Sequence, residues 1–383
     1  MAQVAHTTPA GAERIVALDG LRGLMTVFVV VSHYFAELPG GVNALMFGWV
    51  GVDMFFVLSG YLVGRLILEK SRHANFFSVF YVRRTLRIIP AYVLTVVVVS
   101  GLMALCDPAW SGALSAFPLW SYLTFSQPFF MISTGSIGAH WLAPTWTLAL
   151  EEHFYLLAPL IIVLAPRRLL PWLLGAATVL AVGVRLAFYA LYPDNPMPAL
   201  VLLPSRADLL CLGILAAVAM SVWTVDWPRF DFALRLTPIL AMVSILGLKA
   251  MGGTLADALV PLAMAIGCTT FLLALVRDAP EARRFKSPLL RFFGDNSYCI
   301  YLTHIPVLGL MHGLILGGRP ALETPAQWAV AVAALPVCVL VGWGMTKLVE
   351  EPLTRYGRSW RWSDARRPSR IAPAANAAGG ALT

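Results

Sequence analysis

The chain has 383 residues, of which 59% are hydrophobic and only 13% are charged, whereas soluble domains carry about 25% charged residues. This composition excludes a soluble protein with a single anchor and predicts an all-α polytopic membrane protein, a bundle of about ten transmembrane helices. The formal net charge of +8 comes from Lys and Arg that recur between apolar runs, so we attribute it to membrane orientation rather than to nucleic-acid binding.

The apolar runs predict ten membrane spans with both termini in the cytoplasm. Lys and Arg gather in the segments that this topology places inside, while the outside segment 107–145 contains neither, as the positive-inside rule requires. Lys249 and Arg319 are the exceptions. The predicted spans are 18–37, 46–66, 88–106, 146–165, 169–191, 205–223, 236–250, 255–276, 296–316 and 327–348.

This topology divides the chain into a short cytoplasmic segment (1–14), an integral membrane domain (15–357) and a basic cytoplasmic tail (358–383), which we expect to be disordered. The first segment lacks the charged start and cleavage site of a signal peptide, so the first span is expected to stay in the mature protein. The five cysteines form no CxxC pair, so neither a metal site nor a disulfide framework is predicted.

The first predicted span contains three ionisable residues, Asp19, Arg22 and His33. A charge at the centre of a membrane helix costs about 2.5–3.5 kcal/mol on insertion scales, so such groups usually have a function. Arg22 and His33 are eleven residues apart, which is about three helical turns and places both near one face. This pattern indicates a membrane-embedded active site rather than an inert anchor.

The second span contains Asp53 and Ser59 among apolar residues and several glycines. The glycines are typical of close helix packing. An unpaired carboxylate would be expensive here, so Asp53 is predicted to pair with Arg22 or Arg65, or to line a polar cavity.

Three arginines, Arg83, Arg84 and Arg87, cluster at the mouth of the third predicted span. Arg84 and Arg87 share a helix face because they are three residues apart. The cluster is either a positive-inside anchor or an anion site, since arginine binds phosphate through two parallel hydrogen bonds.

The fourth span has two adjacent acids just inside its predicted outer end, Glu151 and Glu152, followed by His153 and Tyr155. Acids in a first turn can simply interact with the helix dipole. Adjacent carboxylates beside His and Tyr at membrane depth nevertheless favour a functional role.

Later spans add further polar residues. Arg206 and Asp208 are two residues apart and should meet different partners, with Arg185 a candidate partner for one of the acids. His304 lies about two turns into the ninth span, and a structural role is favoured over a catalytic role for it.

These segments, taken in order, resemble the acyltransferase-3 family of polytopic membrane enzymes, which includes O-acetyltransferases of bacterial surface polysaccharides. The family's motif of an arginine, ten residues and a histidine falls on Arg22 and His33, while Thr147 and His153 stand where Ser and Gln are common. The resemblance runs from Ile15 to about Arg358 through the blocks LDGLRGLMTVFVVVSHYF, GVDMFFVLSGYL, RRTLRIIP, TWTLALEEHFYLLAP, SRADLLCLG, SYCIYLTHIP and VEEP.

The resemblance implies an acyl-coenzyme A donor, expected to be acetyl-coenzyme A, on the cytoplasmic side of a bacterial inner membrane, and a hydroxyl acceptor on a carbohydrate or glycan. No metal and no permanently bound cofactor is expected, and neither is the esterase-like domain that some members carry. A transporter or flippase for glycan- or lipid-linked substrates is the alternative class, which inverted repeats with broken helices would favour.

By the same resemblance, His33 is the catalytic base or a transient acyl carrier, and histidine suits proton transfer near neutral pH. Arg22 stabilises charge or orients the donor, and Asp53 or Glu152 positions His33 or the acceptor. Arg84 and Arg87 bind the donor's phosphates. Substrate-binding or structural support is assigned to Asp19, Ser59, Glu151, Arg206, Asp208, Tyr298 and His304.

Overall fold

The computed structural model describes residues 15–363, and all regular structure within them is helical. Ten helices there are long and apolar enough to cross a membrane, which confirms the all-α class and the number of spans. The predicted segment 1–14 and tail residues 364–383 lie outside the described residues. The ten helices are α1 (Val16–Phe35), α2 (Gly48–Lys70), α3 (Phe76–Leu105), α7 (Thr145–Leu164), α8 (Leu170–Leu191), α10 (Ala207–Ser221), α11 (Asp231–Met251), α12 (Thr254–Val276), α15 (Ser297–Leu316) and α16 (Pro325–Met345).

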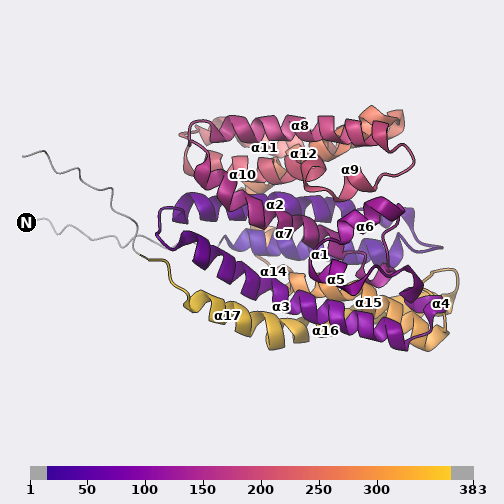
Figure 1. Cartoon of the computed structure of the whole chain (residues 1–383). Coiled ribbons are helices and arrows are strands. Elements are labelled where there is room, and N and C mark those ends of the chain that lie inside the picture. The colour runs from indigo at the N-terminus through magenta and orange to yellow at the C-terminus, as the bar shows by residue number, and fades with distance from the viewer. Residues whose placement is uncertain (1–14, 364–383) are drawn as a thin grey trace, which may run out of the picture.

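These helices run side by side in three layers (Figure 1). Helices α8, α10, α11 and α12 form the upper layer, α1, α2 and α7 the middle one, and α3, α15 and α16 the lower one. Helix α1 contacts both α2 and α15. The most apolar stretch of α15 is 72% buried and that of α11 only 11%. The central helices can therefore hold polar side chains away from lipid, whereas the outer ones cannot.

Short helices join the spans at both ends of the bundle. We call the end at which α1 begins and α2 ends the inner end, following the predicted topology, and the opposite end the outer end. Helices α4, α5, α6 and α9 lie together at one end of the bundle, and α17 lies at the other (Figure 1). The short α-helices are α4 (Pro108–Ser111), α5 (Leu119–Leu123), α6 (Gln127–Thr134), α9 (Met197–Val201), α13 (Ala282–Phe285), α14 (Pro288–Asp295) and α17 (Glu351–Ser359). Five 3-10 turns and one π-helical segment complete the described chain: η1 (Asn43–Leu45), η2 (Ala113–Ser115), η3 (His140–Leu142), η4 (Leu203–Arg206), η5 (Trp227–Phe230) and the π segment η6 (Thr346–Glu350).

Glycines bring α2 and α10 into close contact, as the sequence predicts for this span. A Cβ atom on Gly60 would overlap the backbone of Leu210, and one on Gly213 would overlap the backbone of Val57. Small residues at such positions let membrane helices pack backbone to backbone. This contact fixes the depth of α2, and hence of its polar residues, against the upper layer.

The seventh spanning helix is longer than the predicted span 236–250 and begins at Asp231. Its two early charges are paired with neighbours: Asp231 Oδ1 lies 3.0 Å from Arg277, and Arg235 lies 3.8 Å from Glu281. The hydropathy of the sequence predicted a helix that begins after these charged residues. In the structure they belong to the helix, because each forms an ion pair with a neighbour.

The third spanning helix also begins earlier than the predicted span 88–106. It starts at Phe76, so the arginine cluster lies within the helix and not ahead of it. The chain after α17 packs back on this segment, because Arg83 Nη2 donates a 2.6 Å hydrogen bond to the carbonyl of Trp360. The Trp362 ring stacks on Phe76 at 5.9 Å. Residues 358–363, the first part of the predicted tail, thus lie against α3.

Candidate active site

A cavity of about 390 Å³ lies among α1, α2, α3, α7 and α15 on the inner side of the bundle. Most of the remaining wall is Leu, Ile, Val and Phe, so the cavity combines an apolar lining with a few charges, as ligand sites commonly do. Its polar lining residues are Asp19, Arg22, Ser59, Arg65, Glu69, Arg84, Arg87, Thr147, Glu151, Tyr155, Ser297, Tyr298 and Tyr301. The structure therefore brings together Asp19, Arg22, Ser59, Arg84, Arg87, Glu151 and Tyr298 from the predicted site residues.

Four arginines from three helices line this cavity, and one of them, Arg65 of α2, is paired with Glu69 at 2.8 Å. Arg22 comes from α1 and lies 3.3 Å from Asp19. Arg84 comes from α3, and its guanidinium lies 4.8 Å from the ring centroid of Tyr155, a cation–π contact. One turn further along α3, Arg87 Nε lies 3.9 Å from Glu350 Oε1 and stays 42% exposed. The inner end of the cavity is thus a cationic mouth that can receive an anionic group.

The neighbouring Arg83 is directed elsewhere. Its guanidinium donates to the Trp360 carbonyl and lies 5.0 Å from the Trp362 ring. Adjacent residues on a helix point about 100° apart, so only the i, i+3 pair Arg84 and Arg87 shares the cavity face. This geometry separates a structural arginine from two that face the cavity.

A fixed carboxylate stands on the opposite wall. Ser59 Oγ donates a 2.6 Å hydrogen bond to Glu151 Oε1, and the Tyr155 hydroxyl donates a 3.1 Å bond to Glu151 Oε2. Both oxygens of Glu151 are therefore oriented, and its charge balances part of the arginine mouth. The predicted residue Ser59 has a direct role here, which is to hold Glu151.

Tyr301 and Thr147 meet at the outer end of the cavity. Their hydroxyl oxygens are 2.8 Å apart, and the Tyr301 hydroxyl also donates to the Pro144 carbonyl at 3.2 Å. The next turn of α15 carries His304, whose ring centroid lies 5.4 Å from that of Tyr301. Tyr301 therefore lines the cavity and also contacts the residue beyond it.

His33 and His304 form a pair beyond Tyr301. His304 Nδ1 lies 2.6 Å from the Tyr301 carbonyl oxygen, and His304 Nε2 lies 3.3 Å from His33 Nδ1. His33 Nδ1 lies 2.9 Å from the Val29 carbonyl oxygen. No local pattern predicted that these two histidines would meet, and the packing of α1 against α15 brings them together.

The hydrogen-bond network assigns the protons of this pair. A carbonyl oxygen only accepts, so His304 carries its hydrogen on Nδ1, and in the neutral ring Nε2 is an acceptor. His33 Nδ1 faces that acceptor and the Val29 carbonyl, so it is the donor. The remaining nitrogen, His33 Nε2, then has its lone pair free to accept a proton.

Glu37 stands beside that free nitrogen. Glu37 Oε2 lies 3.6 Å from His33 Nε2, and Ser32 Oγ donates to Glu37 Oε1 at 3.0 Å. Side-chain exposure is 22% for His33 and 37% for Glu37, while His304 is fully buried. His33 therefore faces the outer end of the bundle, with a carboxylate able to stabilise its protonated form. Glu37 was missed in the sequence, although its i, i+4 spacing from His33 is a usable signal.

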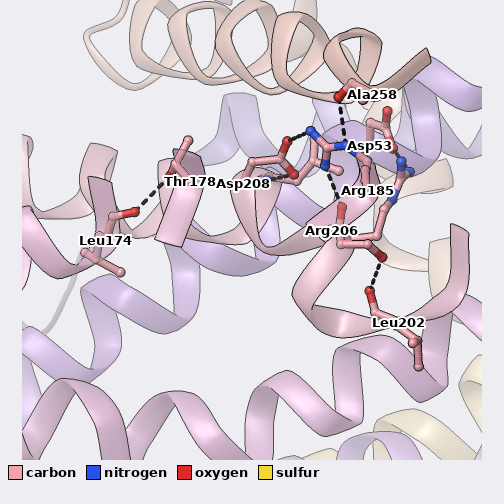
Figure 2. Close-up of polar contacts among 10 residues, drawn as sticks. Asp53, Leu174, Thr178, Arg185, Leu202, Arg206, Asp208 and Ala258 are labelled. Carbon is pink, nitrogen blue, oxygen red and sulfur yellow. Dashed lines mark hydrogen bonds and ion pairs between the residues drawn. The ribbon is translucent and has the colours of Figure 1, made fainter. Parts of the chain in front are cut away.

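The predicted catalytic acid Asp53 and the predicted support residues Arg206 and Asp208 lie outside the cavity. Asp53 forms an ion pair with Arg206, and neither belongs to the cavity lining. Asp208 pairs with Arg185 at 2.7 Å, and all four side chains are buried (Figure 2). Arg206 and Asp208 thus meet different partners, as their spacing predicts, and Asp53 meets neither Arg22 nor Arg65.

The buried pairs join four helices. Arg185 of α8 also donates to the carbonyls of Ala258 on α12 and Ser205 before α10 (Figure 2). Asp53 comes from α2. This network connects the upper layer to the middle one and has the character of a structural element.

Glu152 lies behind the cavity wall. Its Oε1 atom is buried and has no hydrogen-bond partner among the described residues, and it lies within electrostatic range of Tyr298 and Arg84. The polar partners of His33 are Val29, His304 and Glu37, so neither Asp53 nor Glu152 occupies the orienting position expected for it. Among residues 15–363, no group of three or more His, Cys, Asp or Glu side chains is arranged to hold a metal ion.

Comparison with known proteins gives consistent matches. A family model described as an acyltransferase domain matches residues 15–345. O-acetyltransferase OatA of Staphylococcus aureus (strain NCTC 8325 / PS 47) is 25% identical over 336 residues, which are 79% of this chain and 52% of that protein. O-acetyltransferase OatA of Staphylococcus aureus (strain COL) is likewise 25% identical over 336 residues, with 79% and 52% covered. The chain spans about half the length of the curated relatives it matches. No solved structure matches it significantly.

Proposed function

The chain belongs to the acyltransferase family whose model it matches over residues 15–345, and from that premise we propose that it is a multi-pass membrane O-acyltransferase. It moves an acyl group, expected to be acetyl, from cytoplasmic acyl-coenzyme A to a hydroxyl group of a carbohydrate or glycan. The observation that carries this proposal is a cavity with a cationic mouth, apolar walls and a histidine pair beyond its far end.

The donor fits the chemistry of the cavity. Coenzyme A ends in an adenosine bearing three phosphate groups, and Arg84 and Arg87 present planar forks suited to them. The apolar walls suit the uncharged arm that carries the thioester. Arg22, from the opposite helix, supplies a further cation facing the same cavity. The acyl group would then point toward Thr147 and Tyr301.

Proton transfer falls to His33. When an acceptor hydroxyl oxygen attacks the thioester carbonyl carbon, His33 Nε2 takes the hydroxyl proton. An oxygen–carbon bond forms, the carbon–sulfur bond breaks, and coenzyme A leaves as a thiolate that regains a proton. Glu37 stabilises the positive ring that forms, and His304 holds Nδ1. A transient acyl group on His33 Nε2 uses the same free lone pair.

The acceptor approaches from the outer end in this account, where His33 and Glu37 are partly exposed. The protein is expected in a bacterial inner membrane with both termini cytoplasmic, so the arginine mouth faces the donor pool. The family assignment disfavours the alternative of a transporter or flippase.

Donor binding to the purified protein in lipid nanodiscs tests the proposal. Replacing Arg84 and Arg87 together by Gln should weaken binding of acetyl-coenzyme A by at least about 100-fold, because each hydrogen bond to a charged group contributes about 1.5–3 kcal/mol. Lys at both positions should restore binding only in part. Arg83→Gln is the matched control, since its guanidinium binds the Trp360 carbonyl. Unchanged donor affinity in the double Gln variant would contradict the proposed donor site.

A further inference from the structure

The donor cavity and the histidine pair are separate compartments in this structure. The cavity is lined by Arg22 near the start of α1, whereas His33 lies eleven residues further along the same helix, a rise of about 16 Å. Neither His33 nor His304 belongs to the lining of the cavity. An acyl group held in the cavity therefore has to pass a barrier before it reaches His33.

Tyr301 lies at the boundary between the two compartments, since it lines the cavity and contacts His304. The Tyr301 hydroxyl bonds to Thr147 Oγ1 at 2.8 Å, which ties α15 to α7 at the end of the cavity. The Tyr301 ring lies against the His304 ring, with centroids 5.4 Å apart. Trp146, next to Thr147, is only 8% exposed, and its ring lies 6.3 Å from that of Phe56, whereas Leu148 lines the cavity.

The link from Tyr301 to the histidine pair runs through its backbone. His304 Nδ1 donates to the Tyr301 carbonyl oxygen at 2.6 Å, and this bond does not involve the phenol. Rotation of the Tyr301 side chain can therefore break the bond to Thr147 while the histidine pair stays in place.

We propose that Tyr301, held closed by Thr147, is the gate between the donor cavity and the His33–His304 pair, and that it limits the acyl group to short chains. The inference rests on the proposed function and adds the donor's acyl length to it. When the phenol turns aside, the space that it leaves is no larger than one aromatic ring, because Trp146 remains packed against Phe56. An acetyl group fits such a space, whereas a six-carbon chain needs further displacement of packed residues, which is costly in a close-packed interior.

The test measures acyl-chain preference in the full-length protein in nanodiscs, with acetyl- and hexanoyl-coenzyme A supplied separately and a soluble glycan as acceptor. Acylated glycan and released coenzyme A thiol are both quantified. The wild type should strongly prefer acetyl. Tyr301→Ala, which removes the gate, should raise the hexanoyl-to-acetyl rate ratio by roughly tenfold or more.

Two conservative variants keep the test decisive where Tyr301→Ala fails to fold. Tyr301→Phe removes both bonds of the hydroxyl, to Thr147 and to the Pro144 carbonyl, whereas Thr147→Val removes only the first. Both change the volume little and should raise the same ratio by several-fold, Tyr301→Phe more than Thr147→Val, since one buried hydrogen bond shifts an equilibrium by up to roughly tenfold. Tyr81→Phe is the matched control, because it also removes a tyrosine hydroxyl bond between α3 and α7, to the Leu156 carbonyl, away from the cavity.

The outcomes separate the gate from the proposed function. A higher ratio in the Tyr301 and Thr147 variants but not in Tyr81→Phe supports the gate. If every variant that folds transfers acetyl groups with an unchanged hexanoyl-to-acetyl ratio, the gate proposal is refuted while the proposed acyltransferase function is supported. A wild type that releases no coenzyme A and acylates no glycan overturns both.

Discussion

Replacement of Glu37 by Gln gives a graded test of the proton-transfer geometry. Glu37 Oε2 lies 3.6 Å from His33 Nε2, close enough to stabilise the positive ring that forms during transfer. Gln keeps the size of the side chain and an acceptor for Ser32, but it removes the charge. The variant should therefore lower the turnover number without changing donor affinity.

The size of the effect follows from the distance and the exposure. Two unit charges at this separation attract by about 1 kcal/mol in water and by about 4–5 kcal/mol at an effective dielectric constant near 20. Glu37 is 37% exposed and His33 is 22% exposed. The attraction between them should therefore be close to that of exposed ion pairs, about 1 kcal/mol. This corresponds to about a fivefold loss of turnover.

Steady-state acyl transfer with saturating donor measures this loss. Glu323→Gln, a change of an exposed carboxylate in the segment between α15 and α16, should leave turnover unchanged. A loss of more than about 100-fold in Glu37→Gln would make Glu37 the base itself. Turnover equal to the wild type would remove Glu37 from the mechanism.

Two further predictions concern stability and topology. Asp208→Asn leaves the buried Arg185 guanidinium without its carboxylate. The thermal unfolding temperature in detergent should therefore fall strongly, since breaking a buried ion pair costs about 3–5 kcal/mol. Asp257→Asn, which breaks a pair that is about half exposed, should change it little, and equal unfolding temperatures for both variants would refute the structural role of the network. Reporter fusions at Thr383 and within 110–140 should report opposite sides of the membrane, and finding both on one side would remove the ten-span orientation.

The fold was predictable from the sequence because a lipid bilayer permits few backbone structures. A chain segment in lipid satisfies its own backbone hydrogen bonds by forming a helix, so each long apolar run could be assigned as a helix. Boundaries were harder where charges are paired within a helix. Asp231 and Arg235 belong to α11 because Arg277 and Glu281 lie beside them, and hydropathy does not contain that information.

The site was predictable in part, and the limit is long-range packing. The i, i+3 spacing indicated that Arg84 and Arg87 share a face, which local helix geometry determines. The pairing of His33 with His304 joins residues 271 positions apart, and that of Asp53 with Arg206 joins residues 153 positions apart. Such contacts depend on the relative depth of two helices. We therefore expected Asp53 or Glu152 to position His33 or the acceptor, whereas in the structure His33 contacts His304 and Glu37.

The central claim is that His33 Nε2 carries the proton-transfer step. Acyl transfer by purified His33→Ala, measured beside His304→Ala in the same nanodiscs, tests it most directly. The account predicts that His33→Ala binds acetyl-coenzyme A normally but loses about 10²–10⁴-fold in transfer rate. His304→Ala should lose less, because it removes only the partner of Nδ1, which the Val29 carbonyl also holds. Normal transfer by His33→Ala would contradict the account, and loss in His304→Ala alone would move the chemistry to the other histidine.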